Sequence, residues 1–508
     1  MFRRPPTTAL AALALVVVLA ACDSGGEDDA QPGTPTTAPT PVAADPGADV
    51  AEPVLVWDDC GDLECATLTV PIDHDDPDGS TVGIAVARAP ADDDDPIGSL
   101  IVNPGGPGAS GIDFLRNFAL AAPAELRDRF ALVSFDPRGV GRSSSIDCGW
   151  VLDEDRFDPI DASDDLATRV EASLTEAVEE AQQCADAVGE LLPHVGTVAT
   201  ARDLDLLRTA LGDDALTYLG FSYGTRIGAV YAELFPDRVR ALVLDAADRI
   251  RPQPDDTLQQ YVAFESAFET FAAACGALDG CPLGPGEAEQ IVAEIDAELR
   301  TRVLDTDSSL VGPDRVLTRD ELYVALLTSL YSESQWTTLA AGLELARDTG
   351  DGSILQLLTD NYLERGEDGS YSDIVESFTA ITCADESYRP TEAEVRAAAL
   401  TALPQLRVFA PVAPDIGVDC FGWPAPVDPL PETLDAVGAP PIVVVGTTGD
   451  PATPYRWAVD MATELDSAVL VTYEGVVHTA FFSSSCVRDA AVDYLVDLEV
   501  PVDLRCTD

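Results

Sequence analysis

The sequence predicts an α/β fold, with a mostly parallel sheet of eight strands, helices on both faces and a large helical insertion. Short apolar runs alternate with helical patterns over most of the chain, which is typical of such a sheet. Between about residues 248 and 435 this alternation stops and helical patterns dominate. Near residue 222 an apolar run leads through a glycine-flanked serine into a helix, a turn that exposes the serine above the sheet.

The strands and helices divide the chain into a catalytic part, residues 55–247 and 436–508, and a helical insertion, residues 248–435. Strands are predicted at residues 67–70, 82–87, 99–102, 131–135, 216–219, 241–244, 442–445 and 469–472. Helices of the insertion are predicted at residues 258–274, 287–303, 319–347 and 391–403. Because the insertion lies between two strands of the sheet, we expect it to form a lid over the carboxyl ends of the strands.

Ser222 is the predicted nucleophile. The strand at residues 215–219 runs into Gly220-Phe221-Ser222-Tyr223-Gly224, and a helix follows at residues 225–235. The two glycines allow a sharp turn, so the hydroxyl stands at the start of a helix above the sheet. A serine hydroxyl needs a base to remove its proton, so a histidine must lie nearby in the fold.

His478 is the predicted general base, because the chain has only three histidines. His74 lies in an acidic turn and is interpreted as a solvated surface residue, and His194 as a loop residue. His478 follows the apolar strand at residues 468–473, late in the chain, where a loop at a strand's carboxyl end suits the base of a serine hydrolase.

Asp450 is the predicted third member of the triad. The strand at residues 441–445 runs into the loop 446–454, which contains this carboxylate one strand–helix–strand unit before His478. There it would accept the second ring proton of the histidine, fix its tautomer and stabilise the imidazolium.

A glycine-rich loop, residues 103–111, follows the strand at 99–102 and suits an oxyanion hole. Glycines allow a backbone N–H near Gly106 to approach the negative charge that develops on the substrate. The second N–H is predicted from Tyr223, the residue after the nucleophile.

These motifs resemble one known family. The Asn103-Pro104-Gly105-Gly106-Pro107-Gly108 run resembles the His-Gly-Gly-Pro-Gly signature of proline iminopeptidases, in the form typical of secreted actinobacterial tripeptidyl aminopeptidases. Residues 135–143 are similar to the family's Asp-x-Arg-Gly-x-Gly-x-Ser turn, and residues 201–208 and 218–225 to the segment leading into its nucleophile. From about Trp57 onward, the resemblance implies an α/β-hydrolase fold, a serine peptidase acting from free peptide N-termini and a large lid.

The N-terminus resembles a bacterial export signal. Residues 1–22 start with two arginines, continue with an apolar run too short to span a membrane comfortably, and end in Leu19-Ala20-Ala21-Cys22, similar to a lipobox. Lipidation of Cys22 would anchor the protein by acyl chains at the outer face of the membrane. The alternative is cleavage near Ala21 and a protein secreted or held in the cell wall. Residues 23–54, rich in Pro, Thr, Ala, Gly and Asp, are predicted to be a disordered spacer.

Ten cysteines remain after Cys22, and in an exported chain they predict disulfides. Close spacing suggests Cys60–Cys65 and Cys275–Cys281. The sequence leaves the other connectivity open, and one arrangement is Cys148–Cys184, Cys383–Cys420 and Cys486–Cys506. No Cys/His spacing suits zinc, and no metal is predicted.

Composition excludes several kinds of chemistry. The chain has no lysine, which rules out a P-loop lysine, a Schiff base and a Ser–Lys dyad. The net charge of -61 argues against nucleic acid and anionic lipid as partners and favours cationic or free-amine substrates. No organic cofactor is implied.

Lid carboxylates could pair with the N-terminal ammonium of a peptide. Asp385 and Glu386, just after Cys383, are the candidates, and solvated surface charges are the alternative. Together the residues predict an exported, lipid-anchored serine exopeptidase that releases tripeptides or amino acids through an acyl-enzyme. A cell-envelope carboxylesterase or lipase with the same triad is the second hypothesis, and a catalytically silent binding lipoprotein the third.

Overall fold

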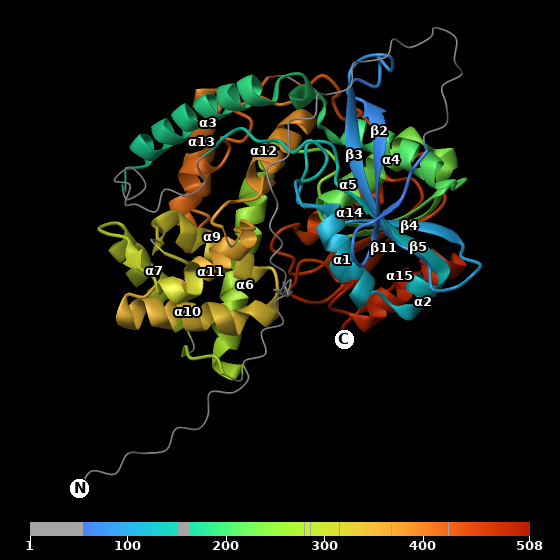
Figure 1. Ribbon diagram of the computed structural model, residues 1–508. Coiled ribbons are helices and arrows are strands. Elements are labelled where there is room, and N and C mark those ends of the chain that lie inside the picture. Colours follow the sequence, from blue (N-terminus) through green and yellow to red (C-terminus); the bar gives the residue numbers. More distant parts are fainter. Residues whose placement is uncertain are drawn as a thin grey trace, which may run out of the picture. The chain divides into compact units, whose positions relative to one another are not determined.

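A ten-stranded sheet organises the protein, in the order β1-β2-β3-β5-β4-β6-β7-β10-β11-β12 (Figure 1). Its strands are β1 (Asp58–Asp59), β2 (Glu64–Pro71), β3 (Thr81–Ala89), β4 (Gly98–Asn103), β5 (Phe130–Phe135), β6 (Leu216–Phe221), β7 (Val239–Asp245), β10 (Ile442–Thr447), β11 (Ala468–Tyr473) and β12 (Arg505–Cys506). Neighbours from β5 to β12 are parallel, while β1, β2, β3 and β5 pair antiparallel. All eight predicted strands are confirmed; the prediction of eight is corrected to ten by β1 and β12, two-residue strands too short to recognise from an apolar run.

The computed structural model describes residues 54–508, except 151–162, 164 and the single positions 279, 285, 314, 367 and 425. The predicted signal segment with Cys22 and nearly all of the spacer lie outside the described residues. Within the described ranges, no helix combines the length and apolar character needed to cross a membrane.

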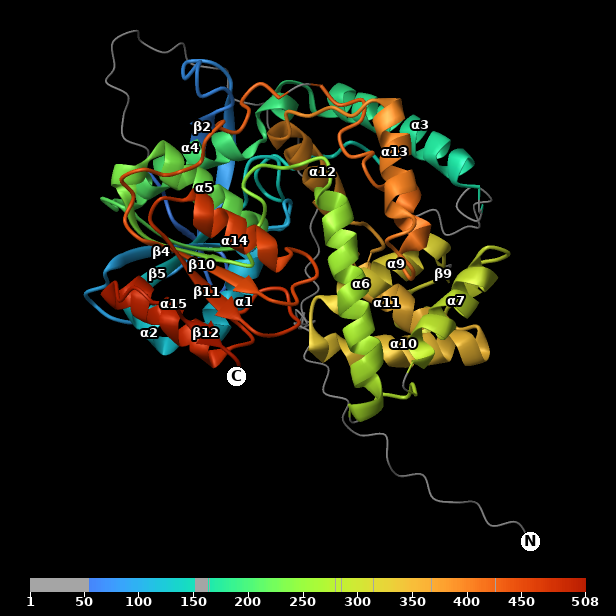
Figure 2. The same cartoon turned by 180° about the vertical axis from the view of Figure 1, so that it is seen from behind.

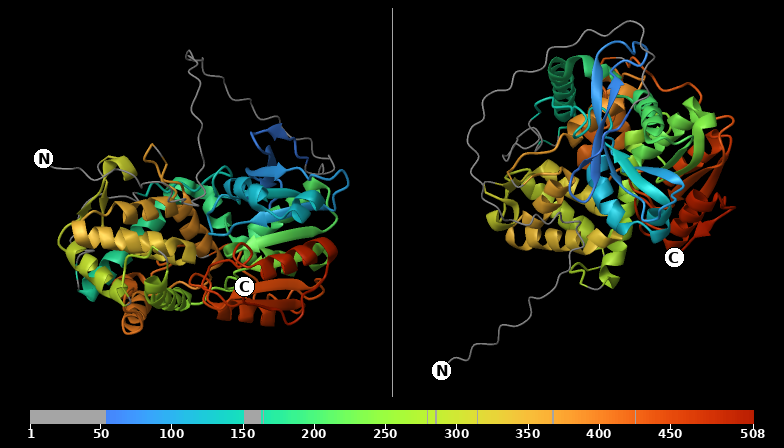
Figure 3. Two further views of the ribbon diagram at one scale, coloured as in Figure 1. Left: turned by 90° about the horizontal axis from the view of Figure 1, so that it is seen from below. Right: turned by 45° about the vertical axis from the view of Figure 1, so that its right-hand side comes forward.

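Helices cover both faces of the sheet (Figures 1 and 3). They are α1 (Gly111–Ala121), α2 (Ala124–Arg129), α4 (Thr197–Leu211), α5 (Tyr223–Leu234), α14 (Tyr455–Glu464) and α15 (Ser485–Asp497). Alternate residues of a strand face opposite sides, so Val444 packs in the core with α4, α5 and α14, while Val443 and Val445 pack with α1, α2 and α15. This burial on both faces explains the continuous apolar runs by which the strands could be predicted.

The helices of the insertion are seen in Figure 2. They have a hydrophobic core of their own, built around side chains such as Phe268, Leu326 and Leu339. These helices are α6 (Asp256–Ala274), α7 (Glu287–Leu299), α8 (Ser308–Val311), α9 (Arg319–Leu330), α10 (Trp336–Thr349), α11 (Ser353–Tyr362), α12 (Ile374–Asp385) and α13 (Glu392–Ala402). The described residues of 248–435 are mainly helical and include one small hairpin of β8 (Leu304–Asp305) and β9 (Val316–Leu317).

Three features differ from the prediction. The helix expected at 319–347 is broken between α9 and α10, where the Ser332 side chain caps a short 3₁₀ turn. Helix α3 (Leu166–Val188), from the predicted catalytic part, packs on α13 through Val170 and Leu174. Helix α12, inside the predicted insertion, instead buries Ile381 in the core of the sheet. Each difference depends on contacts distant in sequence, which local patterns do not encode.

The ten described cysteines form five disulfides. The pairs are Cys60–Cys65, Cys148–Cys184, Cys275–Cys281, Cys383–Cys420 and Cys486–Cys506. This is the arrangement suggested from the sequence, and Cys383–Cys420 ties the end of α12 to the segment that leads back to the sheet.

Candidate active site

Ser222 lies in a sharp turn between β6 and α5. Its backbone has φ 53° and ψ −125°, a strained region for a residue with a side chain. The flanking glycines permit the turn, because a Cβ on Gly220 would lie 2.5 Å from the carbonyl oxygen of Gly224. The Ser222 N–H donates to the carbonyl oxygen of Asp245 at the end of β7 (2.9 Å), which fixes the turn to the sheet. The predicted elbow is therefore present.

His478 and Asp450 meet at the carboxyl end of the sheet. The Nδ1 atom of His478 lies 3.0 Å from each carboxylate oxygen of Asp450. The same carboxylate accepts hydrogen bonds from the N–H groups of Ala452 and Thr453 (2.9 Å each) and from the Thr453 hydroxyl (3.0 Å). Since these donors fix the carboxylate, it can orient the imidazole and hold its Nδ1 proton.

Burial alone would lower the pKa of His478, but the Asp450 carboxylate outweighs burial, and the pKa is raised above its ordinary value. A general base must be neutral, so the rate should fall as the pH drops through this pKa. We therefore expect the acidic limb of the kcat/KM profile to lie above about pH 6.5, the ordinary value for histidine. Substrate hydrolysis measured across the neutral range tests this, and a limb below that pH would contradict it.

Asp245 connects the serine turn with the histidine loop. Its carbonyl accepts from Ser222, while its carboxylate accepts from the N–H groups of Ala480 (3.1 Å) and Phe481 (2.8 Å), just after His478. Burial raises the pKa of this carboxyl group to about 6, although the two N–H groups counteract the rise. The sequence prediction missed Asp245; its position at the end of a buried strand was the available signal.

The glycine-rich loop lies directly against the serine turn. A Cβ on Gly105, whose φ is +97°, would come within 2.4 Å of the Phe221 carbonyl oxygen and 2.9 Å of the Tyr223 backbone nitrogen. Among the turn and loop hydrogen bonds of the described residues, none is donated by the N–H of Gly106 or of Tyr223. The glycine loop thus lies against the serine turn, and neither the Gly106 N–H nor the Tyr223 N–H is used in these hydrogen bonds.

Replacing Gly105 by alanine should therefore damage this site. The new Cβ must push the loop away from the serine turn, and we expect kcat to fall about 100-fold, the effect of losing an oxyanion donor. Gly438→Ala is the matched control, since Gly438 has the same φ of +97° but nothing within 4 Å of the new Cβ. Equal losses in both variants, measured as kcat per folded protein, would show backbone strain instead of displacement of the loop.

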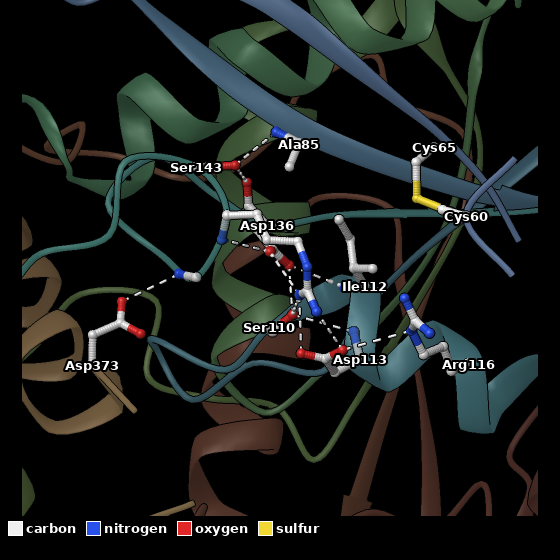
Figure 4. A network of polar contacts seen from close by, with 12 residues as sticks. Cys60, Cys65, Ala85, Ser110, Ile112, Asp113, Arg116, Asp136, Ser143 and Asp373 are labelled. Atoms are coloured by element: carbon white, nitrogen blue, oxygen red, sulfur yellow. Dashed lines mark hydrogen bonds and ion pairs between the residues drawn. A yellow bond between two sulfur atoms is a disulfide. The ribbon is translucent and has the colours of Figure 1, made fainter. Parts of the chain in front are cut away.

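The turn with the Asp-x-Arg-Gly pattern supports the glycine loop (Figure 4). The fully buried Asp136 carboxylate accepts from the Ser110 hydroxyl (2.7 Å) and the Ile112 N–H (3.1 Å), where the loop enters α1. The N–H of Gly141 in the same turn donates to Asp373, which precedes α12 (3.2 Å). A helix of the insertion is thereby attached to the segment that fixes the loop.

The family model described as alpha/beta hydrolase fold matches residues 98–484. The chain belongs to the α/β-hydrolase family. It is 38% identical over 460 residues to serine protease Hip1 of Mycobacterium tuberculosis, covering 87% of this chain and 86% of that protein. It is 36% identical over 539 residues to carboxylesterase B of the same organism (99% and 98%), and 31% identical over 482 residues to tripeptidyl aminopeptidase of Streptomyces lividans (89% and 86%).

The helical insertion of this hydrolase touches the histidine loop. The His478 N–H donates to the carbonyl oxygen of Tyr331 (2.8 Å), and the Tyr331 ring meets the imidazole edge-on at 5.2 Å between centroids. Ser332 forms an isolated antiparallel bridge with Val477. The break between α9 and α10, which the sequence did not reveal, is what directs the Tyr331 carbonyl toward the loop.

Asp385 does not lie where the amine-site prediction requires. The residue is 2% exposed, and its carboxylate accepts from the Thr197 N–H (2.7 Å), the Thr197 hydroxyl (2.6 Å) and the Arg226 guanidinium (3.2 Å). An ammonium group would have to displace these partners. The assignment of Asp385 to the amine site is therefore corrected. The carboxylate is buried, and donors from Thr197 and Arg226 already occupy both of its oxygens.

Glu386 remains a candidate for the amine site. It is partly exposed, and its pKa is raised to about 8, mainly by burial and then by the neighbouring Asp419 carboxylate. Asp419 is exposed and accepts from the Thr257 hydroxyl (2.7 Å). A carboxyl group held near a second carboxylate is stabilised in its ionised form when a cation binds.

The other two histidines do not reach the predicted triad. His74 is not a solvated surface residue as predicted: its side chain is 10% exposed and lies 2.9 Å from Asp203 and 3.1 Å from the buried Arg138. His194 ends a 3₁₀ helix, and its carbonyl accepts from Arg138 (3.0 Å). Within the part of the chain that is described, no group of three His, Cys, Asp or Glu residues could hold a metal ion.

Proposed function

We propose that this α/β-hydrolase is an exported serine exopeptidase that releases tripeptides or amino acids from free peptide N-termini. Ser222 is the nucleophile, His478 the general base and Asp450 the residue that orients it. The observation that carries the proposal is the Asp450–His478 contact at 3.0 Å, in a loop joined through Asp245 to the turn that holds Ser222. A hydroxyl, an oriented imidazole and two free N–H groups are what acyl transfer requires.

The reaction has two steps. The Ser222 oxygen attacks the scissile carbonyl, His478 takes the hydroxyl proton, and the N–H groups of Gly106 and Tyr223 stabilise the oxyanion. The C–N bond then breaks as His478 gives the proton to the leaving amine, which leaves an acyl-enzyme. Water attacks the ester, its proton passes to His478 and then to the Ser222 oxygen, and the released peptide carries the new carboxylate.

A direct substrate comparison tests the exopeptidase. Fluorogenic amides of one and three residues, each free and N-acetylated, should be compared with a short-chain ester on the oxidised protein. We expect the free tripeptide or single-residue amide to be cleaved fastest and acetylation to slow cleavage strongly. Equal cleavage of free and acetylated peptides would contradict an exopeptidase.

A carboxylesterase is the second candidate, favoured by the likeness to carboxylesterase B over 99% of the chain. The same triad serves esters, whose alkoxide leaves without the protonation that an amine needs. Ester turnover without amide cleavage in the same comparison would favour it.

We propose that Glu386, with Asp419 beside it, binds the ammonium group of the substrate. Glu386→Gln should raise KM for free-amine tripeptide amides about 10-fold, the value of one charge-assisted contact, and leave N-acetylated substrates unchanged. Asp385→Asn is the comparison variant, because it changes the adjacent carboxylate, which faces Thr197 and Arg226. A KM that rises equally for free and N-acetylated substrates, or for neither, in Glu386→Gln would overturn the assignment.

Lipidation of Cys22 is proposed as the anchor on the outer face of the cell membrane, on the lipobox pattern of residues 19–22. Cells expressing the wild type should incorporate radiolabelled palmitate into the protein, and Cys22→Ser should not. Label in neither would favour a secreted protein.

A further inference from the structure

Helix α12 belongs to the core of the sheet, although it lies within the helical insertion. Its buried residues Ala380, Ile381 and Ala384 share one hydrophobic cluster with Tyr223 and Ile227 of α5. The disulfide from Cys383 fixes the same turn of the helix. The last residue of α12, Asp385, is thereby held beside the helix that follows Ser222.

Asp385 receives a directed chain of hydrogen bonds. The Thr197 hydroxyl lies 2.6 Å from the Asp385 carboxylate and 2.7 Å from the Tyr223 hydroxyl. A carboxylate paired with Arg226 only accepts, so Thr197 donates to Asp385 and its remaining lone pairs accept from Tyr223. The chain therefore runs from the Tyr223 phenol through Thr197 to Asp385, and every member is buried.

The residues around Asp385 leave room for its carboxylate to reach Thr197. A Cβ on Gly196 would lie 3.1 Å from a carboxylate oxygen of Asp385, so the glycine lets the carboxylate approach the start of α4. The Arg226 guanidinium also pairs with Asp248 (2.7 Å) and lies over the Tyr223 ring at 5.6 Å. The hydrogen bond between its hydroxyl and Thr197, and the Arg226 guanidinium over its ring, thus hold the Tyr223 side chain in place.

The backbone N–H of Tyr223 belongs to the proposed oxyanion hole. Its N–H lies at the start of α5, next to the Gly105 loop, and is one of the two proposed oxyanion donors. The peptide that carries this N–H follows Ser222, whose strained φ of 53° persists only if neighbouring structure holds it. Because the Tyr223 phenol is fixed by its hydrogen bond to Thr197, the peptide group between Ser222 and Tyr223 can rotate less.

We infer that Asp385 is a positioning residue, which through Thr197 and the Tyr223 hydroxyl orients the backbone N–H of Tyr223 toward the oxyanion. This inference rests on the proposed serine mechanism. It also makes the helical insertion part of the catalytic apparatus, because α12 supplies the carboxylate. Geometry that matters only once the oxyanion has formed should affect kcat and leave KM unchanged.

Two variants each remove one hydroxyl from the chain, Tyr223→Phe and Thr197→Val. We expect each to lower kcat about 10-fold, with KM changed less than about 2-fold and equally for free and acetylated substrates. The double variant should lose little more than either single one, since both break the same chain. Thr200→Val is the matched control, because Thr200 lies on the same helix, is 1% exposed and has a hydroxyl without a hydrogen-bond partner.

Binding of a peptide boronate, which mimics the tetrahedral oxyanion, gives an independent readout. Its Kd should rise in Tyr223→Phe and Thr197→Val by the same factor as kcat falls, while a peptide product binds as before. Unchanged kcat and boronate affinity, with only the melting temperature lowered, would overturn the inference and leave a structural network. Failure of the wild type to be labelled at Ser222 by a fluorophosphonate would overturn the proposed mechanism, and with it this inference.

Discussion

Replacing Ser222 by alanine is expected to abolish covalent labelling by a fluorophosphonate and to lower kcat by about 10⁴-fold or more. The turn places Ser222 directly before α5, next to the Gly105 loop. Without the oxygen no acyl-enzyme can form, and the remaining N–H groups could stabilise only direct attack by water. Labelling of purified protein, followed by peptide mapping, measures the first effect, and steady-state hydrolysis of the preferred substrate the second.

Ser266→Ala provides the control, because Ser266 is an exposed residue of α6 whose hydroxyl donates only to the Val262 carbonyl. Its labelling and turnover should equal those of the wild type. Labelling that persists in Ser222→Ala would assign the nucleophile to another residue. Absence of labelling in the wild-type protein, with its disulfides formed, would instead support a binding protein on this fold.

Asp450→Asn should have the second largest effect, a fall in kcat of about 10⁴-fold with little change in KM. The N–H groups of Ala452 and Thr453 fix the aspartate and would keep one amide oxygen in place. The amide NH₂ group then faces Nδ1 of His478, which favours the tautomer that cannot accept the proton of Ser222. The acidic limb of the pH profile should also move to lower pH, since the carboxylate that raises the pKa of His478 is gone.

Asp489→Asn serves as the control, because this aspartate of α15 has a largely exposed side chain next to Arg488. Its kcat and pH profile should match those of the wild type. A loss of less than about 10-fold in Asp450→Asn would mean that a different group orients His478.

The central strands could be predicted because strands such as β4, β6 and β10 are buried on both faces and are therefore nearly continuous apolar runs. The same holds for the serine turn, since a strand, two glycines and a helix are adjacent in sequence. His478 could be predicted as the base because a chain with three histidines offers few candidates. The contact between His478 and Asp450 was expected from the order of strands, and the structure brings the two side chains together.

Other features depend on segments that meet only in the folded chain. The sequence around Tyr331 suits a continuous helix. In the structure α9 ends at Leu330, and the Tyr331 carbonyl accepts a hydrogen bond from the histidine loop. His74 lies in an acidic turn, but Arg138 and Asp203 enclose it. Neighbours in the sequence do not specify such partners, which lie far along the chain.

The two adjacent carboxylates at the end of α12 show the difference between what the sequence determines and what only the tertiary structure determines. The sequence alone indicated a pair of acidic residues in a helical insertion, together with the strands, the serine turn and the closely spaced pairs Cys60–Cys65 and Cys275–Cys281, because all of these are local patterns or short spacings. Only the tertiary structure separated the pair: Asp385 turns into the core toward Thr197 and Arg226, while Glu386 stays partly exposed near Asp419. The physical reason is burial, since a carboxylate can enter the interior only where donors from distant segments meet it.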